Sequence, residues 1–486
     1  MNTTHFSDLD AVPETNHFTL PGPLSAPCLD RQAQRESNAR TYPRRIPIVI
    51  SRARGIYLED LDGRQFIDCL AGAGTVALGH NHPVVVEAIR NALDQEIPLH
   101  TLDLMTPVKD EFVTELFDAL PSEFARHARI QFCSPSGADA TEAALKLVKT
   151  ATGRRSVFSF LGGYHGMSNG ALSLTGNLGA KMAVSGLMPD VNFLPYPYDY
   201  RCPFGMGGEA GHRTGSHYIE SVIRDPESGI VPAAAMIMEA VQGEGGVIPA
   251  PKAWLHEMRR ITEENGIPLI FDEIQSGFGR TGKMFAFEHS GVIPDVLLLS
   301  KAIGGSLPLS VVVYHEKFDT WQPGSHAGTF RGNQLAIAAG LATIRYIRKE
   351  GLPAHAEAMG TRLMAHLRQL QSDVPYIGDV RGCGLMVGVE IVNPAGEANH
   401  RGIHPQHQSM ARRIQQECLR RGLIIELGGR HGSVVRFLPP LIVTAEQIDT
   451  ICEIFATAVR AATAALLQDT GYIPLQVAPL TTAEVN

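Results

Sequence analysis

The feature that most constrains the fold is an alternation of short apolar segments with longer amphipathic ones between residues 129 and 315. GADATEAALKLVKT (137–150) has apolar residues at helical spacing, and WLHEMRRITEENG (254–266) is typical of a helix that ends at glycine. The short runs are RIQFCS (129–134), SVFSF (156–160), AAAMIMEAV (233–241), IPLIFDE (267–273), DVLLLS (295–300) and SVVVYH (310–315). Runs that are apolar throughout indicate strands buried on both faces. The pattern predicts an α/β fold with a mainly parallel central sheet and helices on both faces.

The pattern changes after about residue 333, where long amphipathic helices begin with NQLAIAAGLATIRYIRKEG. Strand-like stretches GLMVGVEIV, GLIIEL and SVVRFLPPLIVT follow, which predicts a smaller α+β domain. The stretch 393–408 is rich in Gly, Pro, Asn and His and is predicted to be a loop. We expect an N-terminal arm that joins the small domain (1–65), a large domain that binds the ligand (66–335), the small domain (336–466) and a tail (467–486).

Composition excludes several classes of protein. A net charge of −8 over 486 residues gives no basic footprint for nucleic acid or a membrane surface. The seven cysteines are scattered and never spaced C-x-x-C, which argues against a disulfide scaffold or a zinc site and suits a reducing cytoplasm. The N-terminus lacks the features of a secretory signal, and no run of about 18 apolar residues predicts a membrane span. We therefore expect a cytoplasmic protein.

Polar residues stand where several predicted strands end. Glu239, Asp272 and Lys301 each follow an apolar run, and Gly137 opens a helix after another. Ligands of open parallel sheets bind outside the carboxyl ends of the strands, so these residues should surround one crevice.

Each residue alone has a simpler explanation, because an acid in that position often caps the next helix and a lysine there is usually a solvated loop residue. Their combination matches the needs of pyridoxal phosphate. A lysine amine forms a Schiff base with its aldehyde, an acid keeps its ring nitrogen protonated, and a helix start binds its phosphate. Lys301, Asp272 and the turn Ser136-Gly137-Ala138 supply these three groups.

These residues lie in stretches that resemble class III pyridoxal-phosphate-dependent aminotransferases. The longest is LIFDEIQSGFGRTGKMFAFEHSGVIPDVLLLSKAIGGSLPLS (269–310), and the resemblance extends over roughly residues 35–465. Further stretches are SPSGADATEAALKLVK (134–149), GGYHG (162–166), MEAVQGEGG (238–246), HAGTFRGNQ (326–334) and VRGCGLMVGVE (380–390). The resemblance implies the aspartate aminotransferase-like fold, with a large cofactor-binding domain and a smaller α+β domain.

The resemblance also implies roles for individual residues. Lys301 would form the Schiff base and then move the proton, while Asp272 would pair with the pyridine nitrogen. Gln275 would bind near the phenolate oxygen, and Tyr164 would stack on the ring with His165 beside it. Backbone N–H groups of Gly137 and Ala138, next to Ser136, would hold the phosphate.

Other implied roles concern the substrate and a second subunit. Thr329 would reach the phosphate of the neighbouring subunit, which predicts a homodimer or a dimer of dimers. Arg381 would bind a substrate carboxylate with Glu244 as its switchable partner, and Glu239 would support the site from behind. The role of Gln242 stays open. His80 and His82 have metal-like spacing, but no metal is predicted because we expect them to be structural.

The N-terminal stretch 36–83 looks like the diaminobutyrate–2-oxoglutarate aminotransferases. These interconvert L-2,4-diaminobutyrate and 2-oxoglutarate with L-aspartate 4-semialdehyde and L-glutamate, by ping-pong chemistry, often for siderophore or ectoine biosynthesis. Ornithine- and 4-aminobutyrate-type relatives carry an arginine where this chain has Met167, which weakens those two alternatives. A 2,1-aminomutase and a cofactor-binding protein without turnover are the remaining alternatives.

Overall fold

The computed structural model describes residues 17–470, and its centre is a seven-stranded sheet in the order β4-β12-β11-β10-β7-β5-β6. The strands are β4 (Ala128–Phe132), β5 (Ser156–Phe160), β6 (Val191–Leu194), β7 (Ala233–Met238), β10 (Leu269–Asp272), β11 (Val296–Leu299) and β12 (Val311–His315). The run from β6 through β5, β7 and β10 to β11 is parallel, and β12 is antiparallel to both of its neighbours. The predicted mainly parallel sheet is confirmed, but β12 is reversed and sequence analysis missed β6.

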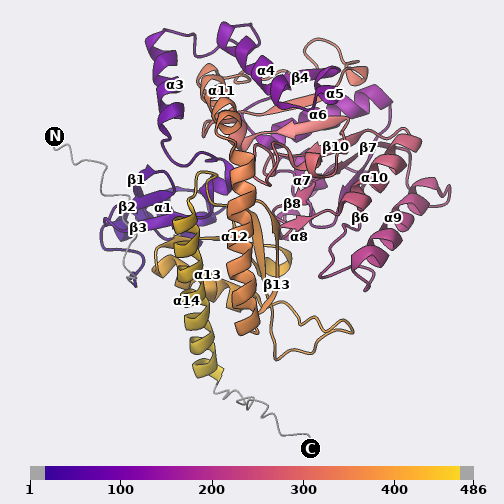
Figure 1. The fold of residues 1–486 in the computed structure, drawn as a ribbon. Coiled ribbons are helices and arrows are strands. Elements are labelled where there is room, and N and C mark those ends of the chain that lie inside the picture. Colours follow the sequence, from indigo (N-terminus) through magenta and orange to yellow (C-terminus); the bar gives the residue numbers. More distant parts are fainter. Residues whose placement is uncertain (1–16, 471–486) are drawn as a thin grey trace, which may run out of the picture.

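Helices cover both faces of this sheet, and the alternation of side chains along the strands explains why (Figure 1). Ile270 and Leu298 point to the face covered by α6 (Gly137–Thr152), whose apolar side packs there. Phe271 and Leu297 point to the other face, which carries α10 (Lys252–Glu264), α4 (Pro107–Ala119) and α11 (Gln334–Lys349). Because each strand is buried on both sides, charged side chains can leave the sheet only at its ends.

The C-terminal part contains one smaller four-stranded sheet and helices α12 (Leu352–Asp373), α13 (Gln408–Arg420) and α14 (Ala445–Thr470), and it adds one strand to a second four-stranded sheet. One sheet has the order β13 (Ile377–Cys383), β14 (Met386–Ile391), β17 (Val434–Phe437), β16 (Glu426–Gly428). The other joins β1 (Ile50–Arg54), β2 (Tyr57–Asp60) and β3 (Gln65–Asp68) to β15 (Leu423–Ile424). Helices α12 and α14 pack together, with α13 against α14 (Figure 1). Strand β3 of the N-terminal segment pairs with β15 of the C-terminal part. This pairing supports our proposal that the N-terminal segment joins the small domain.

The remaining elements are short or peripheral. They are α1 (Ser25–Arg35), α2 (Tyr42–Arg45), α3 (Pro83–Asp94), α5 (Ser122–Ala125), α7 (Asn169–Leu174), α8 (Leu178–Lys181), α9 (Gly208–Arg224), β8 (Val241–Gln242) and β9 (Ile248–Pro249). Short 3₁₀ helices include η3 (Ala286–His289) and η4 (Lys301–Gly304). In the described part of the chain, no helix is long and apolar enough to cross a membrane.

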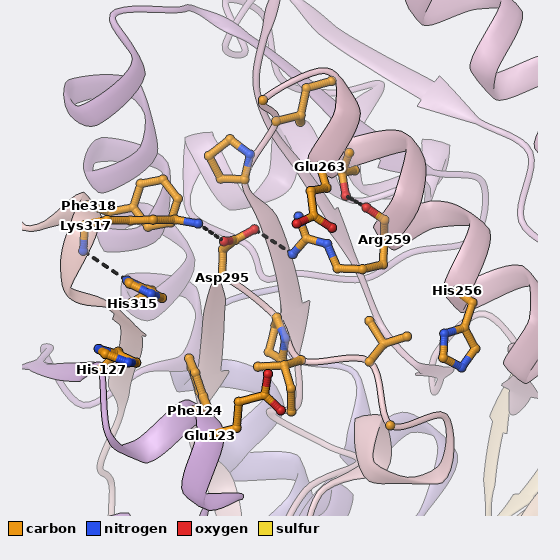
Figure 2. Close-up of a pocket in the computed structure, with 18 residues that line it drawn as sticks. Glu123, Phe124, His127, His256, Arg259, Glu263, Asp295, His315, Lys317 and Phe318 are labelled. Atoms are coloured by element: carbon orange, nitrogen blue, oxygen red, sulfur yellow. Dashed lines mark hydrogen bonds and ion pairs between the residues drawn. The ribbon is translucent and has the colours of Figure 1, made fainter.

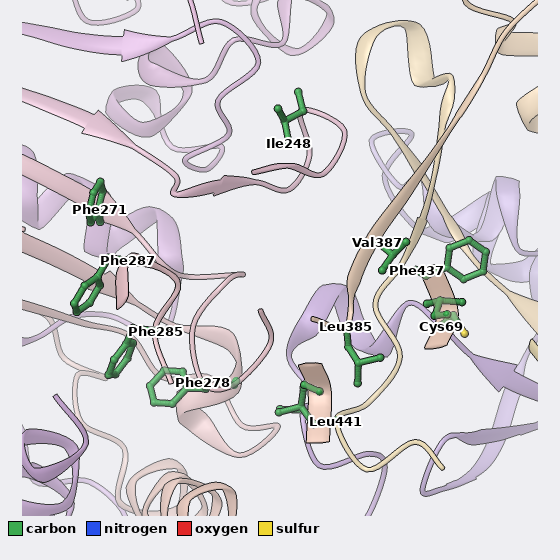
Figure 3. Close-up of a cluster of buried hydrophobic side chains, with 14 of the residues drawn as sticks. Cys69, Ile248, Phe271, Phe278, Phe285, Phe287, Leu385, Val387, Phe437 and Leu441 are labelled. Atoms are coloured by element: carbon green, nitrogen blue, oxygen red, sulfur yellow. The ribbon is translucent and has the colours of Figure 1, made fainter. Parts of the chain in front are cut away.

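One hydrophobic cluster runs from the central sheet into the C-terminal part (Figure 3). Its aromatic side chains stack in series, with Phe271 6.3 Å from Phe287 and Phe285 5.8 Å from Phe287 between ring centroids. Leu385 and Phe437 of the C-terminal part belong to the same cluster. The shared core fixes how the two parts meet, and the site described below lies at their junction.

Gly340 of α11 tests how closely that helix must approach the loop that begins with Lys301. A Cβ at Gly340 would lie 2.1 Å from the carbonyl oxygen of Ile303 in η4. We expect Gly340→Ala to lower the free energy of unfolding by about 1–3 kcal/mol, because α11 must move away from η4. The urea midpoint measures this, with exposed Gly179→Ala in α8 as the control. Equal stability of the two variants would contradict the close approach.

Candidate active site

The carboxyl ends of the parallel strands border a cavity of about 420 Å³. Of the twelve residues predicted for the site, ten line it: Ser136, Gly137, Ala138, Tyr164, His165, Glu239, Glu244, Asp272, Gln275 and Lys301. Thr329 and Arg381 do not line it. Met167 and Ile274 do, which adds apolar surface. The crevice expected from the strand pattern is therefore present.

Asp272 ends β10 and is buried, with only 4% of its surface exposed. Its Oδ2 lies 2.7 Å from Nδ1 of His165, and its Oδ1 accepts a hydrogen bond of 3.0 Å from the backbone N–H of Ile274. His165 is equally buried and its Nε2 has no partner among the described residues. We assign the imidazole proton to Nδ1, so that His165 donates to the carboxylate and holds it at the end of the strand.

One residue, Ser300, separates Lys301 from the end of β11. The backbone of Lys301 is in the left-handed region, with φ of 51°. This conformation is uncommon for a residue with a side chain and is concentrated at functional sites. Burial lowers the pKa of the Lys301 amine, against the opposing effects of Glu244 and Asp272. A lowered pKa leaves more of the amine uncharged, which is the form that acts as a nucleophile.

The turn before α6 offers an anion site. Ser136 is the N-cap of α6, and its hydroxyl oxygen accepts a hydrogen bond of 3.2 Å from the Ala138 N–H. A Cβ at Gly137 would lie 2.9 Å from the side chain of Ile274, so glycine allows the turn to pack against the segment after Asp272. Backbone N–H groups and the dipole at such a helix start favour a phosphate.

Glu239 is buried behind Tyr164. Its carboxylate accepts hydrogen bonds from the backbone N–H groups of Tyr164 at 3.0 Å and Gly243 at 2.9 Å. Burial raises the pKa of Glu239 to about 7. The side chain therefore ties the loop that carries Tyr164 to the turn after β8. The Tyr164 ring faces the cavity, and burial raises the pKa of its hydroxyl.

The expected pair of Glu244 with Arg381 is not formed, and this expectation needs correction. Arg381 instead forms ion pairs with Asp379 at 2.8 Å and with Glu390 at 2.9 Å. Glu244 instead binds Arg436, with Nη2 and Oε1 separated by 2.6 Å. Arg436 stands in the middle of the apolar strand β17 and is 1% exposed. A buried charge inside VVRFL was the sequence signal that could have identified it.

Gln275 and Thr329 are two further residues predicted for the site, and they lie in different surroundings. Gln275 donates from Nε2 to the carbonyl oxygen of Ala73 at 3.0 Å, which ties the cavity floor to the N-terminal segment. Thr329 is exposed and lies outside the cavity within one chain. Their roles toward a cofactor or a second subunit stay predictions.

Sequence analysis gave no role to Glu273, the acid beside Asp272. Its carboxylate accepts hydrogen bonds of 2.7 Å from the backbone N–H groups of Ala286 and Phe287, at the start of η3. It is fully buried, and burial raises its pKa to about 8. Asp272 therefore faces the cavity while Glu273 fixes the next loop in the core.

Other polar groups with metal-like or pocket-like settings have structural partners. His80 binds Asp68 at 2.8 Å, and His82 packs edge-on against Tyr346. Cys133, Asp139 and His326 come close enough to share a metal ion, but Asp139 already caps the N–H of Ser134 at 2.7 Å.

A separate hollow of about 620 Å³ lies at the opposite, amino-terminal ends of β10 and β11 (Figure 2). Its central carboxylate, Asp295, is neutralised by Arg259 at 2.8 Å and Lys317 at 2.7 Å. These ion pairs stabilise the first residues of the neighbouring strands, so we assign the hollow a structural role.

The known proteins that are similar to this chain belong to the class of enzyme that the cavity residues predict. The family model of class-III aminotransferases matches residues 39–459, and the chain belongs to this family. The predicted pyridoxal-phosphate-dependent aminotransferase is thereby confirmed.

Two relatives indicate a group within this family that the chain resembles. The chain is 57% identical over 430 residues to the diaminobutyrate–2-oxoglutarate aminotransferase of Rhizobium meliloti, which covers 88% of this chain and 92% of the relative. It is 52% identical over 410 residues to the enzyme of the same name from Haemophilus influenzae, over 84% of this chain and 90% of the relative. The predicted resemblance to this group is confirmed.

Solved structures share the fold. An amine transaminase from an uncultivated Pseudomonas species in its pyridoxal-phosphate-bound form has a TM-score of 0.77 and 29% identity, over 89% of this chain and 98% of that one. The omega transaminase of Pseudomonas jessenii in complex with PMP has a TM-score of 0.80 and 26% identity, over 90% of this chain and 98% of that one. The predicted transferase fold is confirmed.

The raised pKa of Glu273 gives a prediction for stability against pH. The folded protein holds the Glu273 proton up to about pH 8, whereas an ordinary glutamate releases it near 4.5. The stabilising effect is therefore complete below pH 4.5 and is lost as the pH rises toward 8. Between about pH 5 and pH 8 we expect the wild-type protein to lose more than about 1 kcal/mol relative to Glu273→Gln. Urea midpoints of both proteins, with exposed Glu263→Gln as control, measure this. Parallel pH profiles would contradict it.

Proposed function

We propose that the protein transfers the terminal amine of L-2,4-diaminobutyrate to 2-oxoglutarate, which yields L-aspartate 4-semialdehyde and L-glutamate. The names of the relatives with 57% and 52% identity support this substrate pair. The observation in this chain that carries the proposal is a buried arginine, Arg436, paired with Glu244, an acid that lines the cavity.

The two amine donors differ at the reacting carbon. The terminal carbon of diaminobutyrate carries no carboxylate, whereas the reacting carbon of glutamate carries one. A site that serves both needs a cation that can be covered for the first substrate and uncovered for the second. The buried Arg436 is held by Glu244, whose side chain is 37% exposed and lines the cavity, and we propose that this acid moves aside for a carboxylate. Nε of Arg436 has no partner in the described residues, so the guanidinium has a free donor for a carboxylate.

The cavity residues fit pyridoxal phosphate. The helix start at Ser136-Gly137-Ala138 would hold the phosphate, Asp272 the ring nitrogen, and Lys301 the aldehyde carbon, with Tyr164 against the ring. When bound, this cofactor draws electrons from the carbon that carries the substrate amine. Fixed charges that need no rearrangement contribute most to such catalysis, and the doubly anchored Asp272 carboxylate is one of them.

Lys301 is the proton carrier in this proposal. Its lowered pKa lets the Lys301 Nζ accept a proton from the substrate carbon and return it elsewhere. The surrounding apolar strands exclude bulk water from this transfer. The same amine would serve both half-reactions, so ping-pong kinetics follow.

We further propose that the enzyme is a cytoplasmic homodimer or a dimer of dimers. Its seven cysteines are free, which suits a reducing compartment. Thr329 is exposed in the single chain, next to Phe330 with 66% of its surface exposed. A second subunit would cover this segment and receive the Thr329 hydroxyl at its phosphate site.

The half-reaction without an acceptor tests the substrate. We expect L-2,4-diaminobutyrate and glutamate to bleach the visible absorbance of the holoenzyme, and ornithine and 4-aminobutyrate to do so at least about tenfold more slowly. Lys301→Ala should bind the cofactor without turnover and serves as the control. Fast bleaching by ornithine or 4-aminobutyrate instead would retain an aminotransferase and reject the substrate. Turnover of diaminobutyrate without any 2-oxo acid would point to a mutase.

The assembly has its own test. Light scattering should give a mass of at least two chains, and Thr329→Ala should weaken retention of pyridoxal phosphate by about tenfold, since a hydrogen bond to a charged group is lost. Exposed Thr457→Ala on α14 is the control. A monomer, or a Thr329→Ala protein with unchanged cofactor affinity, would reject the shared site.

A further inference from the structure

Asp139 and His326 are in contact beside the turn that leads into α6. One oxygen of the Asp139 carboxylate, Oδ2, accepts a hydrogen bond of 2.7 Å from the backbone N–H of Ser134 and lies 3.1 Å from Nε2 of His326. The side chains of Asp139 and His326 are 28% and 10% exposed, so solvent weakens their contact only in part. Asp139 therefore joins the turn before α6 to the segment that carries His326.

The second ring nitrogen of His326 shows which way the hydrogen bond to Asp139 runs. Lys146 lies two turns further along α6, and its Nζ is 3.4 Å from Nδ1 of His326. An ammonium group can only donate, so Nδ1 is the acceptor and we assign the ring proton to Nε2. His326 thus donates to Asp139, and α6 holds the ring at both nitrogens.

The segment that carries His326 has no regular structure of its own. Residues 319–333, between η5 (Glu316–Phe318) and α11, contain no helix or strand, so side-chain contacts must fix their position. The carbonyl oxygen of His326 accepts hydrogen bonds from Arg331 Nη1 at 3.0 Å and Gln131 Nε2 at 3.2 Å. A Cβ at Gly328 would lie 2.5 Å from Oγ of Ser134. The segment therefore packs directly against the turn before α6.

We propose that Asp139 and His326 are a positioning pair that links the phosphate sites of two subunits. This inference rests on the proposed dimer, in which Thr329 completes the phosphate site of the neighbouring subunit. Within its own chain, the pair holds Ser134, two residues before the N-cap Ser136 of the phosphate-binding turn. On its other side it holds the segment with Thr329, which is exposed and only three residues after His326. Each pair therefore acts on the phosphate of its own chain and on that of its neighbour.

The physical reason is preorganisation. A donor that is already held in position loses less conformational freedom when it binds an anion than a donor that must first be ordered. Neither Asp139 nor His326 lines the cavity that contains Lys301, so the pair reaches a cofactor only through the groups that it positions. Loss of the pair should therefore weaken contacts to the phosphate and leave contacts to the ring and the aldehyde intact. Pyridoxal, which lacks the phosphate, separates these two sets of contacts.

The first test titrates the apoenzyme with pyridoxal phosphate and with pyridoxal and follows the visible absorbance. In His326→Ala and in Asp139→Asn we expect the affinity for pyridoxal phosphate to fall about tenfold, and that for pyridoxal to stay within about twofold. The double variant should lose no more than the larger single loss, because the two residues act as one unit. His326→Gln keeps a donor and should recover part of the affinity.

The matched control for this titration is a similar pair on the surface. Nε2 of His366 in α12 lies 3.1 Å from Oδ1 of Asp449 in α14, the same separation as in the proposed positioning pair. His366→Ala should leave the affinities for pyridoxal phosphate and for pyridoxal unchanged.

A mixed dimer tests the link between the subunits. One chain carries Lys301→Ala together with His326→Ala and the other is unchanged, so the visible absorbance reports only the site of the unchanged chain. That site has an intact turn but receives Thr329 from the variant chain. We expect it to bind pyridoxal phosphate at least about threefold more weakly than the same site in a mixed dimer whose variant chain carries Lys301→Ala alone.

Three results would overturn the inference. Equal losses for pyridoxal phosphate and pyridoxal would assign the pair a general structural role. Unchanged affinity for pyridoxal phosphate in His326→Ala would remove the pair from phosphate binding. Equal affinities in the two mixed dimers would reject the link between subunits. The proposed shared site fails separately, because a monomer, or unchanged cofactor affinity in Thr329→Ala, shows that failure before the pair is tested.

Discussion

The site depends on one buried carboxylate that is held at the end of a strand. Asp272 would pay a large desolvation cost on its own, and the hydrogen bonds from His165 and the Ile274 N–H offset it. Because β10 and β11 are parallel with Asp272 opposite Leu298, the lysine that follows β11 emerges at the same edge. The register of two strands thus sets the relation between the acid and the amine.

Burial also changes the pKa values of groups around Asp272. It lowers the pKa of Lys301 and raises that of Glu239 to about 7. The same strands that bury these groups keep the Lys301 amine uncharged more often than a surface lysine. The hydrophobic core and the reactivity of the site therefore have a common origin.

The second part of the chain completes the site with its own buried charges. Arg436 and Glu426 come from paired strands of the C-terminal sheet, and Glu244 reaches Arg436 from the turn after β8. The continuous core of Figure 3 holds these two sources together. The carboxylate recognition that we propose for Arg436 and the chemistry that we propose for Lys301 thus belong to different sheets.

The sequence alone determined six of the seven strands of the central sheet and helices α6 and α10, and with them the crevice that collects Asp272, Lys301 and the Ser136 turn. Those follow from local periodicity and from the rule that buried parallel strands release polar residues only at their ends. The antiparallel direction of β12, the cap made by Glu273 and the choice of Arg436 over Arg381 as partner of Glu244 were decided by the tertiary structure. Arg436 lies in a predicted strand and Arg381 just before another, but which one faces Glu244 depends on how two sheets meet. That contact joins residues almost two hundred positions apart, and no local pattern encodes it.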